Sequence, residues 1–307
     1  MIYLKSFHFP SRYEEEGFFN VKSSTFSPKN FRTCYTTKYP FGMFSERGLP
    51  NDFGFRDITI FCGNNGSGKS TILNVIAETL NLKRTSPYNR SDFFDDYVEL
   101  CRYESEETLS LNSSVITSDD VFERVLDIRR INNGIDDKRE DLLREWLDNR
   151  FGDTDTNLHG LRDYDRFRKV ADSRNKNMSQ SQYLRKNLRR NIEERSNGES
   201  ALSLFVDAIH DDALYLLDEP ENSLSPGNQL QLKYFLEDCV RHHGCQFIVS
   251  THSPFLLSLK GARIYDIDSV PVKECKWTEL ECVKVYKEFF EETSYAFQLT
   301  LKVKTHN

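Results

Sequence analysis

The chain has 307 residues, of which 38% are hydrophobic and 29% charged, and its formal net charge is −7. This composition favours a globular protein of one large or two smaller domains and excludes a disordered chain. The negative charge argues against a protein that coats nucleic acid over its whole surface. The sequence has neither an apolar run of membrane-spanning length nor the order of a signal peptide, so we expect a cytoplasmic protein that makes no membrane contact.

The cysteines give no sign of a structural metal or a disulfide framework. They number seven, an odd count, and no two are spaced as C-x-x-C. We therefore expect reduced side chains that serve in packing.

The first motif in chain order follows a predicted N-terminal strand at residues 1–9. Residues 55–82 predict a short apolar strand, a glycine-rich loop and a helix with apolar residues three and four positions apart. The loop fits G-x-x-x-x-G-K-[ST], the Walker A phosphate-binding motif, at every fixed position. The predicted nucleotide-binding residues are Gly63, Asn64, Asn65, Gly66, Ser67, Gly68, Lys69, Ser70 and Thr71.

The residue types of this loop suit a phosphate. Glycines let the backbone turn its N–H groups toward an anion, and the N-terminus of the following helix faces the same place. We expect Lys69 to reach the β- and γ-phosphates of ATP and the Ser70 hydroxyl to bind Mg²⁺. The alternative is a turn that only joins a strand to a helix.

A charged helical region comes next. In residues 119–195, apolar side chains three and four apart among dense charges predict a compact helical lobe inserted into the main domain. Residues 161–195 hold eleven Lys and Arg against five acidic residues. This basic stretch could bind nucleic acid or an acidic partner, or it could be a solvated helix face or lie near the nucleotide phosphates. Residues 195–202, RSNGESAL, predict a polar turn leading into a helix.

Two further strands end in reactive side chains. Residues 213–219 predict a buried strand that ends in Asp218 and Glu219, and a second strand at 246–250 precedes His252. Ligands bind at the carboxyl ends of parallel strands. We expect Asp218 to hold Mg²⁺ directly or through water, Glu219 to orient or deprotonate the attacking water, and His252 to contact the γ-phosphate. The alternatives are a charged turn and a structural histidine. Residues 261–268 and 278–297 predict a late strand and a helix.

Together these motifs resemble ATP-binding-cassette (ABC) ATPases, and among them the soluble SMC-like and OLD-like AAA group, through the sequences LLDEPE and STHSP. The resemblance implies an α/β P-loop NTPase fold, an ABC-type ATPase head with an inserted helical subdomain. Its implied parts are residues 1–118 with Walker A, the insertion 119–195, and residues 196–307 with the other motifs.

The resemblance also gives RSNGESAL a second meaning. ABC ATPases carry a signature of the form L-S-G-G-Q, and Ser196, Gly198 and Glu199 lie where its serine, second glycine and glutamine would lie, although Arg195 replaces the leucine. Residues 222–225 take the place of the D-loop. The resemblance implies that these residues complete the ATP site of a second copy, so that ATP drives formation of a homodimer and of any higher oligomer built from it.

Two family features have no single counterpart here. Residues 71–179 contain no glutamine for a Q-loop. Ser118, Asp119 or Asp120 could replace it, or these residues could form a helix N-cap. Phe41 or Phe44 could contact adenine, or both could belong to a loop that covers the core.

The resemblance implies an ATPase that requires Mg²⁺ and acts as a conformational switch. We expect it to control a separately encoded effector, such as a nuclease in antiviral (phage) defence, and it could also sense nucleic acid. We expect the chain to lack the TOPRIM nuclease domain of OLD-like proteins. The alternative is the nucleotide-binding subunit of an ABC membrane transporter, which the missing Q-loop glutamine, the basic insertion and the S-x-G-E signature oppose. A ring-forming AAA+ motor would not explain SNGES.

Overall fold

The computed structural model describes residues 1–20, 37–45, 48–50, 52–151, 168, 172 and 197–294. It separates the chain into two units, Met1–Val121 with Asn197–Asn307, and Phe122–Ser196. The boundaries expected from the sequence, at 118 and 195, stay a prediction.

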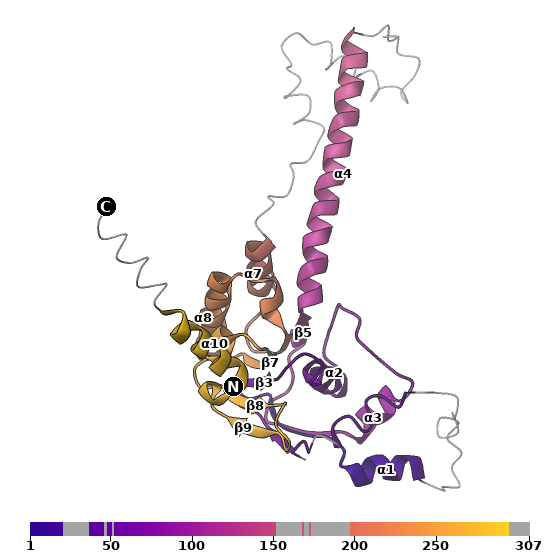
Figure 1. Cartoon of the computed structure of the whole chain (residues 1–307). Helices are drawn as coiled ribbons and strands as arrows, with labels where there is room; N and C mark the ends of the chain where they lie inside the picture. The colour runs from indigo at the N-terminus through magenta and orange to yellow at the C-terminus, as the bar shows by residue number, and fades with distance from the viewer. Residues whose placement is uncertain are drawn as a thin grey trace. The chain divides into compact units, whose positions relative to one another are not determined.

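The first unit is built on a six-stranded sheet in the order β5-β6-β7-β3-β8-β9 (Figure 1). All neighbours are parallel except β8 and β9. The strands are β5 (Ser114–Thr117), β6 (Leu214–Asp218), β7 (Gln246–Ser250), β3 (Ile58–Cys62), β8 (Arg263–Asp266) and β9 (Lys273–Cys275). Four of them, β3, β6, β7 and β8, were expected from the sequence. The first three were expected from their apolar runs, because a parallel strand is covered on both faces.

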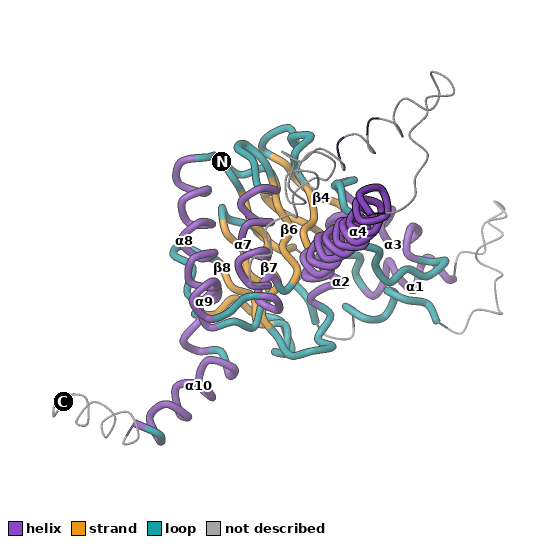
Figure 2. The backbone as a smooth tube through the Cα atoms, turned by 90° about the horizontal axis from the view of Figure 1, so that it is seen from above, coloured by secondary structure: helices purple, strands orange, loops and turns teal. Residues whose placement is uncertain are grey.

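The residues of these strands alternate between two hydrophobic clusters, one on each face. On β6, Leu214 and Leu216 belong to one cluster, and Tyr215 and Leu217 belong to the other. Figure 2 shows α2 and α3 on one side of the strands and α7 and α8 on the other. The sheet is therefore the middle layer of an α/β sandwich, which agrees with the expected P-loop NTPase fold class.

Helices cover both faces of the sheet in the first unit. The helical elements there are α1 (Arg12–Asn20), α2 (Lys69–Thr79), α3 (Phe94–Leu100), α7 (Asn197–Ala208), η4 (Pro220–Ser223), α8 (Pro226–His242), α9 (Pro254–Leu257), η5 (Trp277–Glu279) and α10 (Glu281–Glu292).

A second, antiparallel sheet was not expected from the sequence. Its order is β2-β1-β4, with β2 at Asp52–Gly54, β1 at Leu4–His8 and β4 at Arg102–Ser105. The buried side chain of Gln246, at the start of β7, joins it to the main sheet. The Oε1 atom of Gln246 accepts bonds from the N–H groups of Tyr3 and Leu4, both at 2.8 Å, and its Nε2 donates to the Leu4 carbonyl at 2.8 Å.

Helix α4 (Ser118–Phe151) is the main described part of the region 119–195, for which the sequence predicts a compact helical lobe, and that lobe stays a prediction. Helix α4 is one continuous helix of 34 residues, about 50 Å long. Residues 132–137, in the middle of this helix, include Gly134 but no proline. A lone glycine costs only about 1 kcal/mol in a helix, whereas a proline would break it, so the helix continues.

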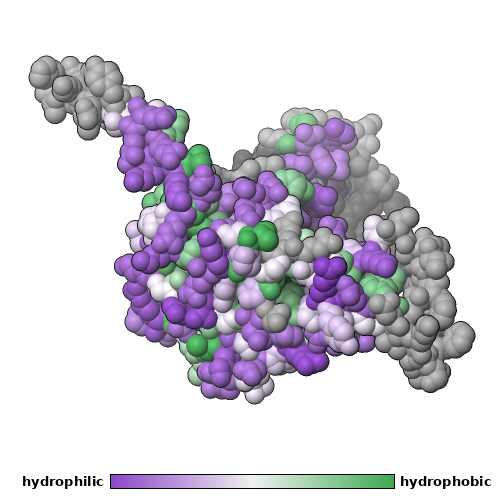
Figure 3. All heavy atoms as spheres, turned by 60° about the horizontal axis from the view of Figure 1, so that its bottom comes forward, coloured by the Kyte–Doolittle hydropathy of each residue, from purple (hydrophilic) through white to green (hydrophobic). Residues whose placement is uncertain are grey.

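Within the described ranges, no helix has both the length and the apolar character needed to cross a bilayer. The face drawn in Figure 3 is mostly hydrophilic, with apolar residues in small groups. The apolar side chains of the first unit lie mainly between the sheet and its helices.

Candidate active site

The phosphate-binding loop joins β3 to α2, as the motif predicts. Gly66 and Gly68 have φ angles of +80° and +100°, which side chains rarely tolerate. Helix α2 begins at Lys69, directly after Gly68. The loop therefore brings the N-terminus of α2, with its free N–H groups, to the carboxyl end of β3.

Lys69 lies deep in this loop, with only 3% of its surface exposed. Its Nζ donates to the carbonyls of Gly63 at 2.8 Å and Asn64 at 3.1 Å. A carboxylate oxygen of Glu219 lies 3.6 Å from the same nitrogen. The ammonium group is thus held where loop backbone and the end of β6 meet.

Asp218 ends β6 and faces the first turn of α2. Its Oδ1 accepts a hydrogen bond from the Ser70 hydroxyl at 3.1 Å and another from the Ser250 hydroxyl. Burial raises the pKa of Asp218, and the two hydroxyl donors partly oppose that rise. A divalent cation beside this carboxylate would favour its ionised form.

Glu219 takes an unusual backbone conformation directly after β6. Its φ is +46°, a strained value for a residue other than glycine. The N–H group of Glu219 donates to the backbone oxygen of Ser250 at 3.0 Å and to its hydroxyl at 3.1 Å. The side-chain amide of Asn222 donates to Glu219 Oε2 at 2.9 Å. Ser250 and Asn222 therefore fix the backbone and the side chain of Glu219, and its second carboxylate oxygen, Oε1, faces Lys69.

A cavity of about 270 Å³ opens at this place. Met43 and seven of the predicted site residues line it. The seven are Asn65, Gly66, Gly68, Lys69, Ser70, Thr71 and Glu219. Among the other predicted residues of the loop, Gly63 and Asn64 bind Lys69, and Ser67 is buried. The structure thus brings the Walker A residues together with Asp218 and Glu219.

His252 follows the neighbouring strand β7 and lines a different cavity. Its Nδ1 lies 3.4 Å from Glu221 Oε1, and its backbone N–H donates to the same oxygen at 2.9 Å. The Thr251 hydroxyl also donates to Glu221 Oε1, at 2.6 Å. Glu221 itself is only 5% exposed. A buried carboxylate therefore holds the turn that carries His252.

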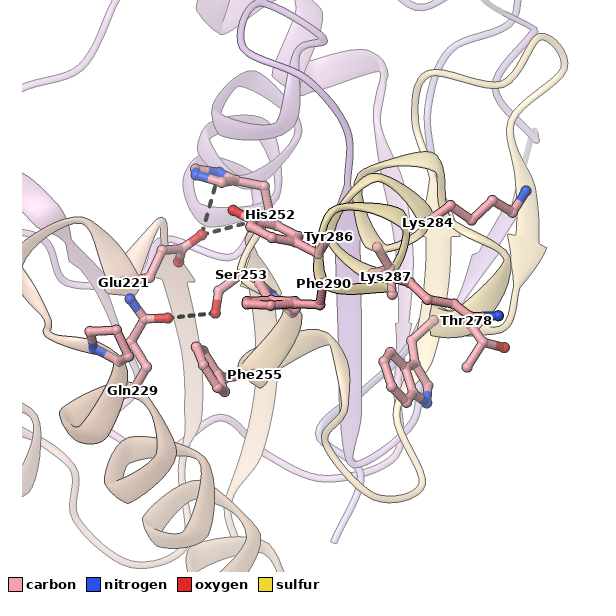
Figure 4. A pocket seen from close by; sticks show the side chains of 14 residues that line it. Glu221, Gln229, His252, Ser253, Phe255, Thr278, Lys284, Tyr286, Lys287 and Phe290 are labelled. Carbon is pink, nitrogen blue, oxygen red and sulfur yellow. Dashed lines mark hydrogen bonds and ion pairs between the residues drawn. The ribbon is translucent and has the colours of Figure 1, made fainter. Parts of the chain in front are cut away.

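The cavity beside His252 has a volume of about 740 Å³ and is mainly apolar. Helix α10 supplies one wall, where Tyr286 and Phe290 lie near His252 and Ser253 (Figure 4). On the opposite side, the Ser253 hydroxyl donates to Gln229 Oε1 at 2.7 Å. His252 thus stands between the strand end and an aromatic groove.

The structure describes only part of the predicted signature. Ser196 lies outside the described residues, and helix α7 begins at Asn197. Gly198 and Glu199 therefore occupy the first turn of α7, where backbone N–H groups are free to bind an anion. The basic stretch at 161–195 lies outside the described residues except for two isolated positions, 168 and 172.

An acidic residue in the first turn of α4 caps the helix. Asp120 Oδ2 accepts hydrogen bonds from the backbone N–H of Thr117 at 2.8 Å and from its hydroxyl at 2.9 Å, and Oδ1 accepts from Ser86. This is the N-cap arrangement that the sequence left open. Thr117 pairs with Asp218 across β5 and β6, so Ser118 and Asp119 follow at the edge of the sheet where β6 also ends.

The two aromatic candidates for adenine contact pack elsewhere. Phe44 is 1% exposed, and the Phe41 ring stacks on Phe18 with centroids 5.0 Å apart. Met43, between them in the sequence, lines the smaller cavity instead.

Ser250, Glu221 and Met43 are site residues that the sequence did not reveal. Ser250 meets Asp218 through the parallel register of β6 and β7, and Glu221 meets His252 through the turn after Asp218. The second glutamate of DEPE was the available signal for Glu221, since a charge beside two strand ends needs a partner when it is buried. A methionine in an aromatic loop gives no comparable signal.

In a comparison with known proteins, a family model matches part of the chain. Residues 162–258 match the family described as "AAA domain, putative AbiEii toxin, Type IV TA system". The match spans about a third of the chain and includes Asp218, Glu219 and His252. It agrees with the expectation of an AAA-type ATPase. No curated protein is similar enough to match the sequence.

Several solved structures of ATPase heads are loosely similar. The SMC head domain from Thermotoga maritima is 15% identical, with 90% of this chain and 99% of that chain covered and a TM-score of 0.34. An Smc head domain from Pyrococcus furiosus, bound to the C-terminal domain of ScpA, is 15% identical with 78% and 94% covered and a TM-score of 0.39. A dimeric ATP-binding cassette bound to ADP and Pi is 15% identical with 75% and 90% covered and a TM-score of 0.34.

Proposed function

We propose that this chain binds and hydrolyses ATP with the help of Mg²⁺. The observation that carries the proposal is the meeting of Lys69 and Ser70, at the start of α2, with Asp218 and Glu219, at the end of β6. All four lie at the carboxyl edge of a parallel sheet, where such folds bind nucleotides.

The donor atoms at this edge fit a magnesium ion. The Ser70 hydroxyl and the Asp218 carboxylate, 3.1 Å apart, are the hard oxygen ligands that Mg²⁺ prefers. In the described part of the chain, no group of three or more His, Cys, Asp or Glu side chains forms a metal site by itself. This fits an ion held by two side chains together with phosphate oxygens and water, whose charge would neutralise the phosphates.

The remaining groups have separate tasks in hydrolysis. Lys69 and the N–H groups at the start of α2 bind and orient the β- and γ-phosphates. Glu219 takes a proton from the attacking water, and Asn222 and the backbone of Ser250 keep its carboxylate in place. His252 holds the side of the γ-phosphate, positioned by Glu221.

The proposed output is a switch between a single head and a two-fold dimer of ABC type. Ser196, Gly198 and Glu199 of one copy would bind the γ-phosphate held by the other copy, at the N-terminus of α7. ATP then joins the two copies, and hydrolysis releases them, because it removes the phosphate that both hold.

We assign this switch to control of a separately encoded effector, such as a nuclease in antiviral defence, in the manner of the SMC-like and OLD-like ATPases. The description of the matched family names a putative toxin of a Type IV TA system. The described cysteines are free thiols, which supports a cytoplasmic location. Nucleic acid is the candidate trigger, through the basic residues at 161–195.

The direct test is nucleotide binding and hydrolysis by the purified chain with Mg²⁺. We expect Lys69→Ala to weaken ATP binding roughly 10- to 100-fold, or about 1.4–2.8 kcal/mol, since it removes the charge that faces the phosphates. Lys5→Ala, a lysine that is 57% exposed on β1, is the charge-matched control. Unchanged affinity in Lys69→Ala would refute the proposed site.

A second assay addresses the trigger. Double- and single-stranded DNA and RNA are added at low salt while ATP hydrolysis is followed. A change of rate that fades as salt is raised is expected for contact with phosphates. If no nucleic acid binds or changes the rate, the nucleic acid part of the proposal fails, and co-purification with an integral membrane subunit would favour a transporter instead.

A further inference from the structure

Two cysteines that are far apart in the sequence meet beside the phosphate-binding loop. Cys62 is the last residue of β3, directly before Gly63, and Cys282 lies in the first turn of α10. Their sulfur atoms are 3.7 Å apart, and both residues are free thiols. A disulfide requires a sulfur–sulfur distance of about 2.05 Å, so a modest movement of two side chains would join them.

The two thiols are not equivalent. Cys62 is buried, with 2% of its surface exposed, whereas Cys282 is partly exposed. The hydrogen bond shared with the Cys62 thiol, together with backbone N–H groups at the start of α10, lowers the pKa of Cys282 to about 7, against the effect of burial. The same shared bond, together with burial, raises the pKa of Cys62. Cys282 is therefore the thiol that ionises and that a small oxidant meets first.

A second close pair, Cys239 and Cys245, shares a similar thiol–thiol bond, which lowers the pKa of Cys245 and raises that of Cys239, but it differs from the first pair in exposure. Cys239 and Cys245 are both buried. The Cys245 thiol lies within hydrogen-bond distance of the carbonyls of His210 at 3.3 Å and His243 at 3.6 Å. A thiol committed to backbone carbonyls and shielded from solvent suits packing rather than reaction.

We propose that Cys62 and Cys282 form a reversible disulfide when the chain meets hydrogen peroxide. The Cys282 thiolate attacks one peroxide oxygen, the O–O bond breaks, and the departing hydroxide takes up a proton to leave as water, which gives Cys282 sulfenic acid. The Cys62 sulfur then attacks the Cys282 sulfur, and the S–O bond breaks. The hydroxide takes the Cys62 proton and leaves as a second water. Two thiols lose two electrons in total, and one peroxide gains them.

The bond would join two parts of the site region. Cys62 continues into the loop that holds Lys69, and its carbonyl accepts the Ile267 N–H at 2.8 Å. Cys282 begins the helix that walls the groove beside His252 (Figure 4). Oxidation would therefore tie α10 to the strand that carries the phosphate-binding loop. The chemistry of the pair does not depend on ATP hydrolysis, so its test is independent of the proposed function.

The sequence allows a clean test by mass spectrometry. Trypsin cuts after Arg56 and Lys69 and after Lys276 and Lys284, so Cys62 and Cys282 fall in separate peptides, 57–69 and 277–284. Cys275 falls in a third peptide, 274–276. The full chain is reduced, treated with hydrogen peroxide, blocked with N-ethylmaleimide and digested.

We expect a linked pair of peptides 57–69 and 277–284 that dithiothreitol separates. The link should vanish in Cys282→Ser and persist in the matched control Cys245→Ser. In Cys62→Ala, Cys282 should stop at the sulfenic acid and react with dimedone, because its resolving partner is gone. Near-ultraviolet circular dichroism of each variant reports whether the fold is kept, and if Cys282→Ser unfolds, Cys282→Ala replaces it.

Three outcomes would overturn the proposal. Both thiols could remain fully available to N-ethylmaleimide after peroxide treatment. Cys282 could be found as sulfinic or sulfonic acid without a link. Cys282 could be joined to Cys275, which would assign the reaction to a different pair.

Discussion

Asp218 is a buried carboxylate, and burying its charge lowers the free energy of unfolding of the nucleotide-free protein. It is held by hydroxyl groups of Ser70 and Ser250 rather than by a cation in direct contact. Burial raises its pKa, which means that its ionised form is less favourable in the folded protein than in the unfolded chain. The folded state thus gains stability as the pH falls through the raised pKa, and it bears the cost at neutral pH.

Asp218→Asn should therefore stabilise the nucleotide-free protein while it removes hydrolysis. Asparagine keeps an oxygen for both hydroxyl donors but carries no charge. We expect a gain on the order of 1 kcal/mol, or roughly 2–4 °C in Tm, measured by thermal unfolding at pH 7 with a chelator present. Asp207→Asn, an exposed acid on α7, is the control. A Tm lower than that of the unchanged protein would contradict this account.

Glu221 is a positioning residue, because it contacts the His252 turn and not the phosphate-binding loop. One of its oxygens accepts bonds from Thr251 and from the backbone of His252, and lies near the imidazole. Small displacements of a group at a reacting centre cost large factors in rate. The turn after β7 should therefore lose its fixed geometry when this carboxylate is changed.

Glu221→Gln is expected to lower kcat roughly 10- to 100-fold with little change in ATP affinity. The amide can still accept the two N–H and O–H bonds, but it does not attract the imidazole. Steady-state hydrolysis and equilibrium ATP binding, measured separately, check this split. Glu281→Gln, exposed on α10, should behave as the unchanged protein. Equal loss of affinity and rate would instead indicate a general disturbance of the fold.

At the scale of elements, parallel strand register decides which residues meet. Thr117, Asp218 and Ser250 are paired neighbours across β5, β6 and β7, so the residues that follow them lie along one edge of the sheet. The sequence predicts the strands and the edge, because apolar runs and terminal acids are visible in it. It does not predict that Ser250 bonds to Asp218, since strand order and register come only with the fold.

Other parts of the fold could not be predicted from the sequence, each for a different reason. The strands β2 and β4 have three and four residues, too few for a periodic pattern to stand out. In α4, the dense charges weaken the apolar pattern, so the sequence predicts helical structure there but not the continuous length of the helix. The choice of Met43 over Phe41 and Phe44 depends on how one loop packs against the core, which composition does not encode.

Helix α7 should be required for dimerisation and not for nucleotide binding in its own chain. Ser196→Arg places a large cation beside the start of this helix, where the other copy's γ-phosphate is proposed to bind. We expect ATP affinity to be kept, while ATP-driven dimerisation weakens at least tenfold, about 1.4 kcal/mol. Binding and sedimentation experiments on one preparation measure both. Asp207→Arg, near the end of α7, is the control. If Ser196→Arg dimerises as strongly as the unchanged protein, residues 195–202 are only a turn with no role in dimerisation.

At the scale of the whole molecule, we propose that the ATP site of this chain is complete only when two copies meet. In this proposal, one half of the site is formed within a single chain by Lys69, Ser70, Asp218 and Glu219, and the start of α7 would offer the other half to a second copy. A catalytic base that is removed without loss of ATP binding should therefore trap the assembly before hydrolysis.

The most direct measurement is the mass in solution of Glu219→Gln with ATP and Mg²⁺, determined by light scattering or sedimentation. Glutamine keeps the shape of Glu219 but cannot take a proton from water. We predict a stable dimer with ATP, a monomer with ADP, and a monomer with ATP when Lys69→Ala is added to the variant. A Glu219→Gln protein that binds ATP and stays monomeric would contradict the central claim.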